Sequence, residues 1–202
     1  RLLLPRLREV GGTIVQLSSV AGRTVFPESG WYAATKHAIE AMSEALYQET
    51  CTFGVKVRLI QPGSFDTEFL PTASAVSPPL PASSAYTALQ ELWTARKIEV
   101  LEPPQHPRAV VQAIVDALDD PRPFYRQPVG PDAARMLALK DAIGPDAYSR
   151  LAGQRNGGPA LWSPAWVLQA EDAELGPARQ AAALGHLDHW KATDEGRQAL
   201  QR

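Results

Sequence analysis

One segment constrains the fold of this chain more than any other: two short apolar, β-branched runs on either side of a long helical pattern. The runs are "TIVQLSS" at residues 13–19 and "VKVRLIQPG" at residues 55–63. Between them, from Trp31 to about Phe53, no glycine or proline interrupts the helical pattern, and Gly54 then provides a typical stop. A strand, a helix of about 20 residues and a second strand form a βαβ unit, which predicts parallel strands joined by a right-handed crossover. The fold class is therefore α/β.

The flanking segments extend this unit. "RLLLPRLREV" resembles the last turns of an amphipathic helix that ends at Gly11–Gly12. Residues 71–84 are rich in proline, serine and alanine and predict a loop or mobile flap, and the whole flap region spans about 68–100. Further helices are expected at about 85–100, 106–120 and 131–144, with an edge strand at 122–130. From about residue 153 the sequence becomes linker-like and then resembles a helical tail, which divides the chain into domains 1–152 and 153–202.

Composition excludes several classes of function. The chain has 202 residues, of which 45% are hydrophobic, and a formal charge of −2, so nothing favours nucleic acid or an anionic membrane surface as a partner. Its apolar runs are much shorter than the ~20 residues that cross a bilayer. The single cysteine, Cys51, excludes an intrachain disulfide. We expect it to be a buried or half-buried free thiol in a reducing compartment, which indicates a cytoplasmic protein.

A candidate proton-transfer pair lies at the start of the long helix. Tyr32 and Lys36 are four residues apart, so they share a helix face. A tyrosine with its ordinary pKa of about 10 is a weak base at neutral pH, and an adjacent cation favours the phenolate. Ser18 and Ser19 end the preceding strand, and ligands of open α/β sheets bind outside the carboxyl ends of strands. By itself the pair is weak evidence, because any helix with these two residues yields a surface pair by chance.

The motifs together resemble those of the short-chain dehydrogenase/reductase family. "LSSVAG" is similar to the family's serine segment, "YAATK" to its YxxxK motif, and "PGSFDT" to the PGxxxT that follows the next strand. The family's serine stands thirteen residues before the tyrosine, which selects Ser19 over Ser18. Residues 1–70 look like the second half of the family's Rossmann-type core, a partial doubly wound parallel sheet. The similarity becomes weaker along the chain and ends near residue 152.

The resemblance implies an oxidoreductase that passes a hydride between NAD or NADP and an alcohol or ketone. Tyr32 would exchange a proton with the substrate oxygen, Lys36 would lower the tyrosine pKa and bind the nicotinamide ribose, and Ser19 would hold the substrate oxygen. Four residues would border the nicotinamide: Pro62, Gly63, Ser64 and Thr67. The flap would cover the substrate and exclude water.

Each of these residues also has a purely structural interpretation. Ser19 could cap a loop, Thr67 could cap the next short helix, and Pro62–Gly63 could end a strand. His37 is expected to be a solvated helix residue. No metal site is predicted, since His186 and His189 have no accompanying ligand set.

The family's cofactor-binding half is not found in this sequence. The sequence has no counterpart of the glycine-rich TGxxxGxG turn. It also lacks the residue that selects NAD or NADP and the family's catalytic asparagine. We therefore expect an N-terminal part to be missing and the chain alone to be inactive. The alternative is a non-catalytic binding or scaffold protein of the same fold. A stripe of small residues on the tyrosine helix (Ala34, Ala38, Ala41, Ala45) favours a homodimer or tetramer.

Overall fold

The computed structural model describes residues 2–76, 80–81, 83–100 and 104–155. The chain divides into two compact units. Of the described residues, the first unit contains 2–76, 96–100 and 104–137, and the second contains 80–81, 83–95 and 138–155.

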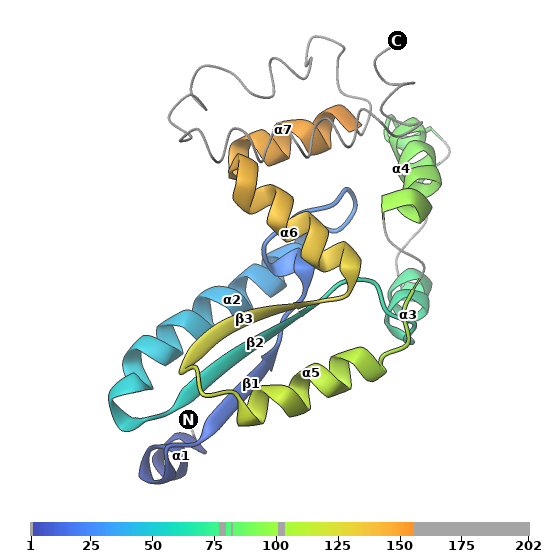
Figure 1. The fold of residues 1–202 in the computed structure, drawn as a ribbon. Helices are drawn as coiled ribbons and strands as arrows, with labels where there is room; N and C mark the ends of the chain where they lie inside the picture. Colours follow the sequence, from blue (N-terminus) through green and yellow to red (C-terminus); the bar gives the residue numbers. More distant parts are fainter. Residues whose placement is uncertain (1, 77–79, 82, 101–103, 156–202) are drawn as a thin grey trace. The chain divides into compact units, whose positions relative to one another are not determined.

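The first unit is built on a three-stranded parallel sheet (Figure 1). Its strands are β1 (Thr13–Leu17), β2 (Lys56–Pro62) and β3 (Phe124–Val129), in the order β1-β2-β3. Thr13 pairs with Lys56, and Val57 pairs with Phe124, so the carboxyl ends of the strands meet at the same edge. This is the α/β parallel sheet that the sequence predicts.

Helices cover both faces of this sheet (Figure 1). The unit contains α1 (Leu4–Val10), the 3₁₀ turn η1 (Val20–Gly22), α2 (Gly30–Thr50), the 3₁₀ turn η2 (Cys51–Phe53), α3 (Phe69–Val76), α5 (Arg108–Asp119) and the start of α6 (Pro131–Ile143). Successive side chains of a strand point to opposite faces. On β2, the Arg58 side chain accordingly reaches α5, where it donates to the carbonyl oxygen of Ala117, and the Gln61 side chain reaches α2, where it donates to Glu40.

One hydrophobic cluster of this unit lies between the sheet and α5. Ile60, Tyr125 and Val129 of the strands pack with Ala113 and Ala117 of the helix, and Ala117 is completely buried. Small residues on the helix let it approach the sheet closely, while the larger apolar side chains come from the strands. Helix α5 is only partly buried, because Val111, Val115 and Leu118 are about half exposed.

The second unit contains most of α4 (Thr87–Val100), the end of α6 and α7 (Pro145–Arg155). Its small core consists of Ile143, Ala147 and Leu151, with Leu139 and Tyr148 against them. Gly144 joins α6 to α7 with a φ of 84°, a conformation that glycine adopts readily.

Among the described residues, the predicted helices and strands are confirmed except in two places. The loop predicted from residue 71 is wrong at its start, because Phe69–Val76 forms α3. Pro71 lies in the first turn of that helix, where a missing N–H costs nothing. Helix α7 was not predicted, and it continues to Arg155, past the linker expected from residue 153. The predicted helical tail, with His186 and His189, lies outside the described residues.

The exposure of Cys51 and the backbone conformation of Glu28 were not predicted. Cys51 was expected to be buried or half-buried, but it is exposed in the turn that follows α2. Glu28, just before α2, has a φ of 63°, which is uncommon for a residue with a Cβ atom. Within the described residues, no helix is both long enough and apolar enough to cross a membrane.

Candidate active site

The two predicted strand-end motifs meet at the carboxyl edge of the sheet. Ser19 follows β1, and its hydroxyl donates to the carbonyl oxygen of Pro62, the last residue of β2, at 3.4 Å. The same hydroxyl accepts the N–H of Ala21, so Ser19 also caps the η1 turn. Ser19 therefore does cap a loop. To hold a substrate oxygen, its hydroxyl proton would turn from the 3.4 Å bond with Pro62 to that oxygen, because a hydroxyl has one donor.

The neighbouring Ser18 faces a different environment. It is 3% exposed, and its hydroxyl has no hydrogen-bond partner. A Cβ atom placed on Gly22 would lie 2.6 Å from the Ser18 hydroxyl and 3.2 Å from a carboxylate oxygen of Glu40, so Ser18 lies on the side of α2. Of the two serines, Ser19 is the one whose hydroxyl bonds to the end of β2, at Pro62.

Tyr32 and Lys36 lie on the same face of α2, as the spacing predicts. The Lys36 ammonium is 5.7 Å from the centre of the Tyr32 ring and donates to the carbonyl oxygen of Leu17 at 3.1 Å. Leu17 is the last residue of β1, so this bond fixes the lysine beside the serine turn. Partial burial lowers the pKa of Lys36, because desolvation disfavours the ammonium.

Helix α3 extends the site beyond β2. The rings of Tyr32 and Phe69, the first residue of α3, are 5.1 Å apart in a tilted arrangement. The Thr67 hydroxyl accepts the N–H of Phe69 at 3.4 Å, so Thr67 caps the start of α3, as its structural interpretation expects. The segment predicted as a flap thus places an aromatic ring against the candidate catalytic tyrosine.

Asp132, which was not predicted from the sequence, holds the Pro62–Ser64 segment. The N–H of Gly63 donates to the carbonyl oxygen of Val129 at 2.9 Å, which ties it to β3. The N–H of Ser64 donates to a carboxylate oxygen of Asp132 at 2.7 Å. Asp132 is completely buried in the first turn of α6.

Glu40 was also missed, although its position in the sequence is informative. It lies four residues after Lys36, so the helix places it on the same face as the Tyr32–Lys36 pair. Its side chain is buried and accepts hydrogen bonds from Gln61 at 2.9 Å and from Arg126 at 2.8 Å. Glu40 thus joins the helix of the candidate catalytic pair to β2 and β3.

Among the described residues, no group of three or more histidine, cysteine, aspartate or glutamate side chains is arranged to hold a metal ion. His37 has an exposed side chain, and its Nδ1 atom lies 2.9 Å from the carbonyl oxygen of Ala33 on the same helix. These contacts give His37 no part in the site.

Comparison with known proteins agrees with this geometry. Residues 1–76 match the family model described as short chain dehydrogenase. The chain is 31% identical over 160 residues to the 3-ketodihydrosphingosine reductase of Bacteroides thetaiotaomicron, covering 75% of this chain and 56% of that protein. The part of the chain that the family model covers, residues 1–76, belongs to the short chain dehydrogenase family.

Two solved structures share the fold. A short-chain dehydrogenase from Streptomyces avermitilis is 31% identical, with a TM-score of 0.52 over 67% of this chain and 48% of the other. A Burkholderia cenocepacia short chain dehydrogenase, in complex with NADP, is 22% identical, with a TM-score of 0.53 over 77% of this chain and 51% of the other. The chain spans about half the length of the curated relatives that it matches.

Proposed function

We propose that this chain forms the catalytic half of an oxidoreductase that transfers a hydride between NAD or NADP and an alcohol or ketone. The observation that carries the proposal is the position of Lys36. Its ammonium lies beside the Tyr32 ring and is held by the last carbonyl oxygen of β1, next to the serine turn. A cation held in this way stabilises a phenolate, which suits general acid–base catalysis.

In this proposal two side chains act on the substrate oxygen and two act on the tyrosine. The Tyr32 hydroxyl exchanges a proton with that oxygen, and the Ser19 hydroxyl holds the oxygen by a hydrogen bond. Lys36 keeps its charge beside the tyrosine, and Phe69 covers the tyrosine ring. The name of the Bacteroides relative, a reductase of a 3-keto compound, supports a ketone as one member of the substrate pair.

The residues present fit a nicotinamide cofactor. An ammonium has three N–H donors, and the bond to Leu17 uses one of those on Lys36, so ribose hydroxyls can accept others. The PGS segment, Pro62–Ser64, lies at the end of β2, at the edge where α/β sheets bind ligands. When bound, NAD or NADP would supply or accept the hydride. The Thr67 hydroxyl adds a donor at the same segment.

The test is Tyr32→Phe in a protein that carries this chain together with a glycine-rich cofactor segment. Loss of the proton-transfer group lowers kcat by about 10²–10⁴-fold. Tyr47→Phe is the matched control, because Tyr47 lies on the same helix and contacts Phe124 of β3 rather than the site. Near-normal hydride transfer in Tyr32→Phe would show that the mechanism is wrong.

Two measurements address the non-catalytic alternative: an activity assay with the cofactor segment present, and a cofactor titration of the 202-residue chain. A scaffold of the same fold would show no oxidoreductase activity even with a cofactor segment present. The 202-residue chain by itself is expected to bind NADH and NADPH weakly and to be inactive. Tight binding by this chain would contradict that expectation. It would show that cofactor binding does not require the glycine-rich turn.

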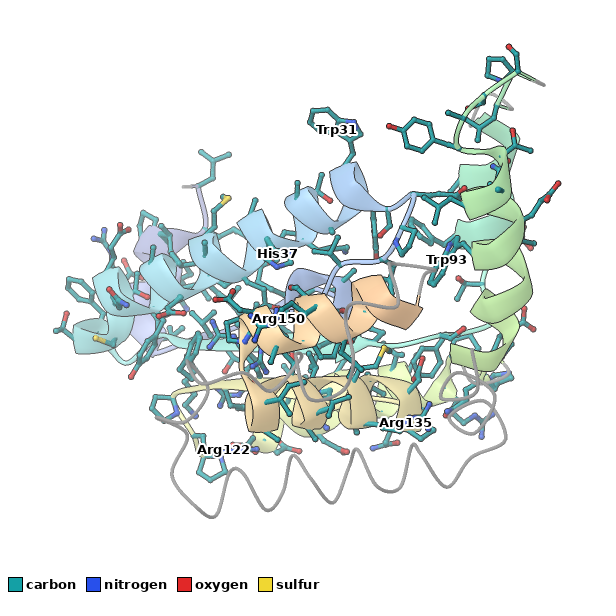
Figure 2. All side chains as sticks on the ribbon, turned by 90° about the horizontal axis from the view of Figure 1, so that it is seen from above. Trp31, His37, Trp93, Arg122, Arg135 and Arg150 are labelled. Carbon is teal, nitrogen blue, oxygen red and sulfur yellow. The ribbon has the colours of Figure 1, made fainter. Side chains whose placement is uncertain are left out.

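We further propose that the protein is a homodimer or tetramer that associates through α2. Its small-residue stripe, Ala34, Ala38, Ala41 and Ala45, is exposed, and Trp31 beside it is 91% exposed and stands clear of the helix (Figure 2). A monomeric mass by light scattering would contradict this, and Ala38→Glu should convert an oligomer to monomers. The cytoplasmic location is proposed from the single free thiol and is tested by cell fractionation.

A further inference from the structure

Asp132 is a buried carboxylate with only one of its two oxygens hydrogen-bonded. Its exposure is 0%, one carboxylate oxygen accepts the Ser64 N–H at 2.7 Å, and the other has no hydrogen-bond partner. Burying a carboxylate is costly unless the group is paired or hydrogen-bonded. The first turn of α6 offsets part of this cost, because a helix N-terminus favours negative charge.

Two glycines leave the space that the Asp132 carboxylate occupies. A Cβ atom on Gly63, after β2, would lie 2.1 Å from the Asp132 carboxylate, and one on Gly130, after β3, would lie 2.7 Å from it. Gly63 does not have the positive φ that favours glycine, so its conformation does not demand this residue type. Glycine is needed at position 63 because the carboxylate approaches the backbone.

These contacts connect the ends of two strands to one side chain. Ser64 is itself 8% exposed, so without Asp132 its N–H would be a buried donor without a partner. The next residue, Phe65, packs in the core with Ile60 and Val129. Asp132 therefore fixes the Gly63–Ser64 peptide at the point where the chain leaves the sheet.

We propose that Asp132 is a positioning residue that holds the Gly63–Ser64 peptide in the orientation needed to contact the nicotinamide. This inference rests on the proposed function, which assigns the PGS segment to the cofactor. Asp132 would act through the backbone of that segment and touch neither cofactor nor substrate. Its loss should weaken cofactor binding.

The first experiment needs no cofactor. Hydrogen exchange of the Ser64 amide is measured in the 202-residue chain. In Asp132→Ala this amide loses its acceptor and should exchange at least tenfold faster. Asp132→Asn keeps an acceptor oxygen and should restore protection to within about threefold. Asp146→Ala is the matched control, because Asp146 is also acidic and in the first turn of a helix but is exposed. It should leave the Ser64 amide unchanged.

The second experiment tests the consequence for the cofactor. In a protein with the cofactor segment present, the Kd of NADH or NADPH should rise at least tenfold in Asp132→Ala and much less in Asp132→Asn. A residue that only stabilises the fold would leave the Kd of the folded protein unchanged. If the wild-type protein binds neither NADH nor NADPH, the proposed function is wrong, while Ser64 exchange still decides whether Asp132 holds this peptide.

Gly63→Ala covers the case in which Asp132→Ala folds poorly, and the double mutant tests whether both changes act through the same contact. Gly63→Ala alone should speed Ser64 exchange, because its methyl group displaces the carboxylate. Once Asp132 is alanine, the space is empty and Gly63→Ala should add little. Equal effects of Gly63→Ala in both backgrounds, or unchanged Ser64 exchange in Asp132→Ala, would overturn the inference.

Discussion

The buried Glu40 carboxylate gives the sharpest prediction about stability, because the chain offers a matched control on the same partner. Arg126 of β3 donates to Glu40 at 2.8 Å through Nε and to Glu44 at 2.7 Å through Nη2. The Glu40 side chain is 8% exposed and that of Glu44 is 50% exposed. Burial lowers the pKa of Arg126, but the hydrogen bonds to both carboxylates outweigh it and raise that pKa above its ordinary value.

The magnitude for Glu40→Gln follows from the number of acceptors that are lost. Glu40 accepts from both Gln61 and Arg126, whereas a glutamine has one oxygen and must direct its NH₂ group at one of these donors. A hydrogen bond to a charged group contributes about 1.5–3 kcal/mol. Arg126 keeps Glu44 and some solvent contact, so we expect Glu40→Gln to lower the free energy of unfolding by about 2–3 kcal/mol. Glu44→Gln removes an exposed ion pair and should cost about 0–1 kcal/mol.

The assay is urea unfolding of the 202-residue chain at neutral pH, followed by circular dichroism. The slope with urea must be the same in all variants for the comparison to report stability alone. Equal losses in Glu40→Gln and Glu44→Gln, or a loss below about 1 kcal/mol in Glu40→Gln, would refute the argument from burial.

Three further predictions follow from other contacts. Arg58 is completely buried and donates to the carbonyl oxygens of Ala117, Asp120 and Pro123. Arg58→Met leaves these three acceptors without their donor, so it should cost about 3–5 kcal/mol in urea unfolding. Arg58→Lys should not restore this stability, because an ammonium lacks the fork of donors. Because burial lowers the pKa of Lys36 below its ordinary value, the unfolded chain binds more protons than the folded chain between the two pKa values. The stability of wild type relative to Lys36→Met should therefore rise as pH increases through that range; a fall would contradict it. Glu28→Gly should raise the melting temperature by relieving the φ of 63°, with a gain of about 0.4–1 kcal/mol; a lower melting temperature would contradict this.

Much of the fold was predictable because its elements have strong local signals. The β-branched runs of β1 and β2 and the long helix between them are confirmed in their predicted positions. Gly54 ends the 3₁₀ turn after α2 with a φ of 70°, as a helix-stop glycine does. The error at α3 came from composition, since proline and serine favour loops except in the first turn of a helix.

The candidate site was only half predictable for a physical reason. Tyr32 and Lys36 are neighbours on one helix, so their spacing alone predicts their proximity, and the structure has them 5.7 Å apart from ring to ammonium. Glu40 shares that helix face, so the same spacing argument could have predicted its position. Asp132 was not, because it is 68 residues from Ser64, whose N–H it accepts.

The sequence by itself determined the local pieces of this protein: the strands, the helix that carries Tyr32 and Lys36, and the order of the family's motifs. Only the tertiary structure decided what holds these pieces together. Three contacts join residues from separate elements: Lys36 with Leu17, Glu40 with Arg126, and Asp132 with Ser64. Helix and turn propensities act over a few residues, whereas the burial of a charge depends on every element packed around it.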